Sequence, residues 1–198
     1  MRQQQHAQTV GHREGDRKAR QSWRSGGKRP VLRFVIVLVV LLGAFNYVYY
    51  VAFVRGDLLR PHLETTARLT GGILRVLGND VRVSGTSVSS SRFSMGIDNG
   101  CDALQAVAFY VFAVVASPMR VSLLARAVSI VLGSLLLVGV NLVRIASLYY
   151  VGVYYPNAFE TVHIEVWQTM FVFLPIFLWL IWVWWVIRRS AELANATV

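Results

Sequence analysis

The hydrophobic pattern of this chain consists of four long apolar runs separated by short polar segments. The runs cover residues 34–54, about 103–119, the 17 uncharged positions between Arg126 and Arg144, and 166–187. A helix that crosses a bilayer needs about 17–25 apolar residues, so each run is long enough to span, the second only just. The pattern predicts an all-α fold, a polytopic membrane bundle of about four transmembrane helices.

One sizeable polar segment, residues 55–100, separates the first run from the second. Apolar residues recur in its first half at roughly helical spacing: Leu59, Leu63, Ala67, Leu74 and Leu77. A glycine pair at 71–72 interrupts the pattern, which predicts one or two short amphipathic helices on the membrane surface. Residues 81–84 and 93–97 then alternate apolar and polar across Gly85 and a serine-rich run, as expected of a small β-hairpin.

Aromatic residues gather at the ends of the runs. Four tyrosines follow Arg144 and four tryptophans close the last run: Tyr149, Tyr150, Tyr154, Tyr155, Trp179, Trp182, Trp184 and Trp185. Tyrosine and tryptophan are enriched where a membrane meets water. Both groups are therefore expected to form interfacial belts.

Composition supports a membrane protein and locates the positive charge. Hydrophobic residues make up 55% of the chain and charged residues 15%, against about 25% charged in a soluble domain. The net charge is +10, and nine Lys or Arg lie within the first 33 residues. Such a cluster before a span is usually a cytoplasmic retention signal. No aromatic interleaving accompanies it, so we expect membrane lipid and no nucleic acid as a partner.

These patterns divide the chain into three parts. Residues 1–30 are predicted to be a disordered basic cytoplasmic tail, 31–189 one transmembrane domain, and 190–198 a short cytoplasmic tail. The side of the membrane that holds the two tails carries more Lys and Arg than the 55–100 loop does. This bias favours a cytoplasmic N-terminus in a cell (inner) membrane. The 55–100 loop is then extracytoplasmic.

Three polar residues border the apolar runs on this outer side. Cys101, the only cysteine, lies in Asp98-Asn-Gly-Cys-Asp at the start of the second run. Arg144 ends the third run, in Asn141-Leu-Val-Arg, and His163 precedes the fourth. Each crossing reverses the chain, so counting crossings places all three residues at the same level on the same face. We therefore expect one thiol-based active site there.

The three side chains have complementary chemistry. A thiol beside an apolar helix has a raised pKa, which a cation such as Arg144 or protonated His163 is expected to reverse. Cys101 would be the nucleophile and His163 the proton shuttle. Arg144 would stabilise an oxyanion or hold a substrate carbonyl or carboxylate. Asn141, one helical turn before Arg144, would orient it.

Other interpretations remain open from the residues alone. A lone membrane cysteine is usually a small apolar residue, an arginine at a span end usually a snorkelling anchor, and an interfacial histidine usually just solvated. The outer loop of a non-enzymatic scaffold subunit could instead bind an exported partner. A metal or haem site would have only Cys101 and His163, too few ligands for a closed site. One cysteine allows no intrachain disulfide, and the residues indicate neither a cofactor nor an oligomeric state.

Acidic residues also lie near the three polar ones, at Asp98, Asp102, Glu160 and Glu165. Whether any of them supports the site stays open at this point.

The motifs resemble the exosortase/archaeosortase family of polytopic membrane transpeptidases. Asn99-Gly-Cys101, Asn141-Leu-Val-Arg144-Ile and His163 carry the resemblance, which covers roughly residues 34–189. It implies cleavage of a C-terminal sorting tail (a short motif such as Pro-Glu-Pro, a hydrophobic span and a basic cluster) through a thioester on Cys101. His163 would be the acid/base and Arg144 the transition-state stabiliser. The family commonly has Gly two residues after the cysteine, where this chain has Ala103.

Overall fold

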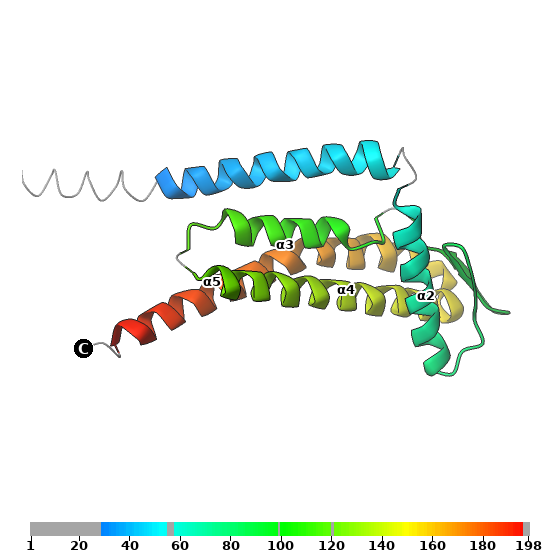
Figure 1. Cartoon of the computed structure of the whole chain (residues 1–198). Helices are drawn as coiled ribbons and strands as arrows, with labels where there is room; N and C mark the ends of the chain where they lie inside the picture. Colours follow the sequence, from blue (N-terminus) through cyan, green and yellow to red (C-terminus); the bar gives the residue numbers. More distant parts are fainter. Residues whose placement is uncertain (1–28, 55–57, 99, 120, 196–198) are drawn as a thin grey trace, which may run out of the picture. The chain divides into compact units, whose positions relative to one another are not determined.

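The computed structural model describes residues 29–54, 58–98, 100–119 and 121–195 (Figure 1). The chain forms two units, one up to Val40 and one from Leu41 onward, and the second holds the loop segment, the sheet and the later helices. The predicted tail at 1–30 lies almost wholly outside the described residues and stays a prediction. At the other end, helix continues to Asn195, past the predicted end of the last span.

Helices dominate the described residues. The first helix, Arg29–Val51, runs into the π-helix η1 (Tyr49–Val54). It is followed by α2 (Arg60–Val76), α3 (Leu104–Ala116), α4 (Leu123–Tyr154), the short 3₁₀ turn η2 (Pro156–Ala158), the π-helix η3 (Thr161–Gln168) and α5 (Thr169–Asn195). Three of these segments are long and apolar enough to cross a membrane: Arg29–Val51, Leu123–Tyr154 and Thr161–Glu192. The helical membrane fold is thus confirmed, with α3 shorter than expected.

α3 packs against both α4 and α5 (Figure 1). It runs antiparallel to α4, so the start of α3 and the end of α4 lie at the same end of the bundle. Tyr110 of α3 lies where α4 carries Gly133, whose missing side chain leaves room for the ring. Trp182 of α5 is buried in the same hydrophobic cluster as Tyr110. The expectation that Trp182 belongs to an interfacial belt is therefore wrong.

α4 is longer than the third apolar run. It continues from Arg144 to Tyr154, and it buries Ile145, Leu148 and Tyr149 against the loop segment. Packing on this second layer stabilises a helix beyond the length that a bilayer requires. Arg144 is therefore inside a helix and not at its end, and Tyr149 is a core residue and not part of a belt.

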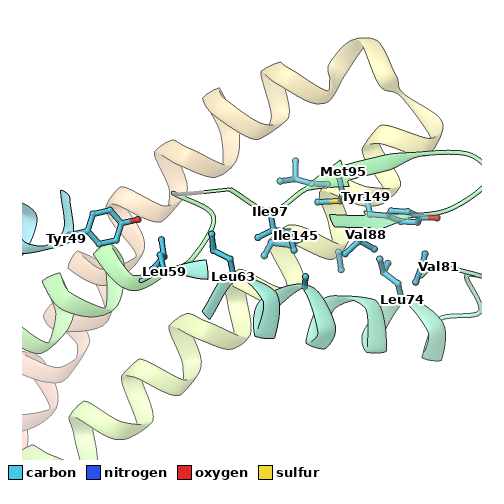
Figure 2. Packing of buried hydrophobic residues seen from close by; sticks show 13 residues of the cluster. Tyr49, Leu59, Leu63, Leu74, Val81, Val88, Met95, Ile97, Ile145 and Tyr149 are labelled. Atoms are coloured by element: carbon cyan, nitrogen blue, oxygen red, sulfur yellow. The ribbon is translucent and has the colours of Figure 1, made fainter. Parts of the chain in front are cut away.

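The loop segment forms a small layer on this end of the bundle (Figure 2). One helix, α2, runs through both glycines of the 71–72 pair, so the segment forms one of the one or two helices expected. A side chain at Gly71 would meet Val83 of β1, so glycine here permits close packing of helix and sheet. α2, the sheet and α4 share one cluster: Leu59, Leu63, Leu74, Val81, Val88, Met95, Ile97, Ile145 and Tyr149.

The sheet has three strands where a hairpin was expected. β1 (Arg82–Ser84), β2 (Ser87–Ser89) and β3 (Ser94–Gly96) form an antiparallel meander in that order. The serine-rich run supplies the middle strand, in which Val88 is fully buried. A single apolar residue among serines is too weak a pattern to predict a strand.

Candidate active site

A tight turn before α3 carries the only cysteine. The backbone N–H of Cys101 donates to the carbonyl of Asp98 at 3.0 Å. Gly100 and Ala103 both have left-handed backbones, with φ of +95° and +59°. Ala103 occupies the position where the resemblance expects glycine, so the left-handed conformation survives here without the residue that favours it.

Side chains from three other helices hold this turn in place. Asn141 of α4 donates from Nδ2 to the Cys101 carbonyl at 2.7 Å. His62 of α2 places Nε2 at 3.2 Å from the Asp102 carbonyl. Tyr49 of the first helix donates its hydroxyl to the buried Asp102 carboxylate at 2.5 Å, and that carboxylate also accepts the N–H of Leu104 at 3.0 Å. The cysteine is therefore presented on a backbone fixed from several directions.

His163 lies next to the thiol. Its Nε2 is 3.5 Å from Cys101 Sγ, within hydrogen-bond reach of a sulfur atom. The histidine belongs to the π-helix η3, whereas the sequence places it ahead of the last span. π-turns within longer helices are often found at functional sites. The ring also packs against Phe159, with ring centroids 5.8 Å apart.

Arg144 is buried beside the same turn. Only 1% of its surface is exposed, and its guanidinium carbon lies 5.0 Å from the centre of the Phe171 ring. Its Nε and Nη2 have no hydrogen-bond partner among the described residues. Arg144 borders a pocket of about 290 Å³ that Gly100, Asp102 and Ala103 of the cysteine turn also line. Unpaired donors of a buried cation are costly, so they indicate a place for an oxygen-bearing ligand.

The pKa of the Cys101 thiol is raised above its ordinary value. Burial is the main cause and raises the pKa. Arg144 is the next largest influence and lowers it, and the charges of Asp102 and Asp98 raise it further. Arg144 therefore does not reverse the effect of burial as expected, and the expectation for protonated His163 stays a prediction. Cys101 rests as a neutral thiol and needs a base at the moment of attack.

Cys101, His163 and Arg144 come together as the count of crossings expects, but Asn141 does not act as expected. Its described hydrogen bond goes to the Cys101 carbonyl and not to Arg144. Sequence reasoning left Asp102 open and missed Tyr49 and His62, which hold the turn. Their partners lie 53 and 40 positions away, so local spacing carries no signal for them. The described residues contain no group of three or more His, Cys, Asp or Glu that could hold a metal ion.

The fold and site define a helical membrane protein whose single thiol meets an imidazole and a buried guanidinium at one end of its bundle. The chain belongs to the transmembrane exosortase family, since the family model described as Transmembrane exosortase (Exosortase_EpsH) matches residues 22–182. It has no significant match among curated proteins or solved structures. Membership confirms the resemblance and is consistent with a membrane transpeptidase.

Proposed function

We propose that this chain is a membrane cysteine transpeptidase with Cys101 as nucleophile, His163 as acid/base and Arg144 as oxyanion stabiliser. The observation that carries the proposal is the 3.5 Å approach of His163 Nε2 to Cys101 Sγ, beside a buried guanidinium with unpaired donors. A nucleophile within reach of its base, next to a preformed cationic donor, is the arrangement that acyl transfer requires.

The first half of the reaction forms a thioester. His163 takes the thiol proton while Cys101 Sγ attacks the scissile carbonyl, and the carbonyl oxygen becomes an oxyanion. Arg144 stabilises this charge through the donors that lack partners among the described residues. The C–N bond then breaks, His163 gives its proton to the leaving amine, and the acyl group stays on sulfur.

The second half transfers the acyl group. His163 deprotonates an acceptor nucleophile, which attacks the thioester and passes through a second oxyanion beside Arg144. The C–S bond breaks and Cys101 regains its proton. Asn141 contributes by fixing the Cys101 carbonyl, and hence the backbone from which the sulfur attacks.

The substrate and orientation belong to the same proposal. The family resemblance suggests exported membrane-anchored proteins with a C-terminal sorting tail of motif, apolar span and basic cluster. The basic N-terminal residues favour a cytoplasmic N-terminus, which puts the Cys101 end of the bundle on the outer face of the inner membrane.

The test replaces the nucleophile in the source cell and follows host proteins that carry such tails. Cys101→Ala and Cys101→Ser should leave the tails uncut at normal expression of the chain, and His163→Ala should slow cleavage by at least 100-fold. Ser147→Ala is a matched control, because Ser147 follows Arg144 on α4 and only bonds the Arg144 carbonyl. Normal cleavage by Cys101→Ala would exclude the proposed mechanism.

A further inference from the structure

The pocket beside Arg144 has polar groups at its walls that the proposed chemistry does not use. Three carboxamide side chains line it, each from a different helix: Asn46, Gln105 and Gln168. All three are exposed, and neither glutamine makes a side-chain hydrogen bond to another described residue. Asn46 donates only to the Leu42 carbonyl of its own helix.

Carboxamides are the neutral polar side chains in the lining of this pocket. The rest of the lining is mostly apolar, with Phe109, Phe171, Val172 and Ile176 among its members. Each of these amides can both donate and accept hydrogen bonds to a ligand that enters the pocket. Three of them around one pocket, with an unpaired guanidinium beside it, point to a ligand with several polar atoms.

Pro175 leaves one backbone carbonyl of α5 without its usual helical donor. Pro175 lies inside α5 and lines the pocket together with Phe171, four residues earlier. Proline has no N–H, so the Phe171 carbonyl loses the donor that a regular helix would supply. Residues of the lining thus supply both hydrogen-bond donors and acceptors, and an extended polypeptide backbone presents partners for both.

We propose that this pocket binds an extended polypeptide segment directly preceding a client's membrane span, with Asn46, Gln105 and Gln168 bonding its main chain. The inference rests on the proposed function and deepens it by assigning a substrate subsite beside Arg144 and the cysteine turn. A phospholipid head group is the other polar ligand of a membrane. The buried Asp102 carboxylate in the lining repels a phosphate, and carboxamides that both donate and accept match a peptide better.

Two neighbouring positions of α5 provide a matched test. Val172 lines the pocket and Phe173 does not, yet they are 58% and 53% exposed. A photoreactive benzoylphenylalanine is placed at each position in the full chain carrying Cys101→Ala, in membranes of the source cell. At position 172 the crosslinked peptide should directly precede a C-terminal apolar span of a host protein. At position 173 the adducts should be lipid.

Removing the amides supplies the second measurement. Gln105→Met with Gln168→Met should lower the peptide crosslink at 172 at least tenfold, and each single change two- to fivefold. In the chain with its cysteine, the same changes should leave iodoacetamide reaction with Cys101 within twofold, which shows that the turn is intact. Lipid-only adducts at 172, equal peptide yields at 172 and 173, or an unchanged yield in the double variant would overturn the proposal.

The two proposals fail differently. If only the chemistry is wrong, the peptide crosslink at 172 persists while the unmodified chain leaves the same host protein uncut. If only the subsite is wrong, the host protein is cut and the crosslink at 172 is absent.

Discussion

Tyr49→Phe removes one oxygen from the hydrogen bond that ties the cysteine turn to the first helix. Both partners are buried, and the hydroxyl lies 2.5 Å from the Asp102 carboxylate. A hydrogen bond to a charged group contributes about 1.5–3 kcal/mol, and its loss leaves a buried carboxylate oxygen short of a donor. We expect the free energy of unfolding to fall by about 2 kcal/mol, which for a chain of this size lowers Tm by roughly 4–8 °C.

The assay is unfolding of the purified chain by SDS titration in mixed micelles, with a double-mutant cycle of Tyr49→Phe and Asp102→Ala. The interaction energy should be at least about 1.5 kcal/mol. Tyr47→Phe is the control, because Tyr47 lies on the same helix and is 71% exposed. Its effect should stay within about 0.5 kcal/mol. An interaction energy below about 0.5 kcal/mol would refute the assignment of this bond as an anchor of the turn.

Other changes test the helix–sheet contact, the left-handed residue and the thiol. Gly71→Ala should cost about 1–3 kcal/mol by overpacking against Val83, and Val83→Ala should restore most of that loss in the same titration. Ala103→Gly relieves about 1 kcal/mol of left-handed backbone strain but loses about 0.8 kcal/mol of methyl burial, so Tm should barely change. Ala103→Val should lower Tm clearly, because a β-branched residue is strained in this backbone conformation. The raised pKa of Cys101 favours the neutral thiol in the folded state. Stability should therefore be full below the ordinary thiol pKa and fall as pH rises through the folded pKa. Asp102→Asn should move the pH midpoint of iodoacetamide labelling downward, and an upward shift would contradict the charge effect.

The helices and their order follow from the sequence because the length of an apolar run is a local property. The count of crossings was enough to bring Cys101, Arg144 and His163 to one end, since it depends only on how often the chain reverses. The end of α4 was misjudged at Arg144 because a charged residue usually marks a span end. Here the charge is buried against Phe171, and the helix continues by packing on the loop segment.

The contacts that hold the cysteine turn could not be predicted from the sequence. Asn141, His62 and Tyr49 each meet the turn across 40 or more residues, and only the packed bundle decides which polar side chain reaches it. The raised pKa of Cys101 has the same origin. The direction of this pKa shift depends on whether burial or the neighbouring charges have the larger effect. The sequence shows the charges but not how deeply the sulfur is buried.

The central claim is that Cys101 becomes acylated by the substrate. The direct measurement is acid-quenched mass spectrometry of the chain isolated from its source cell, with and without hydroxylamine, which cleaves thioesters. The account predicts a hydroxylamine-labile adduct on the peptide that contains Cys101, ending at the cleavage site of a host sorting tail, and much less of it in His163→Ala. Tails that are cut at the normal rate by Cys101→Ala, with no labile adduct on the unmodified chain, would contradict it.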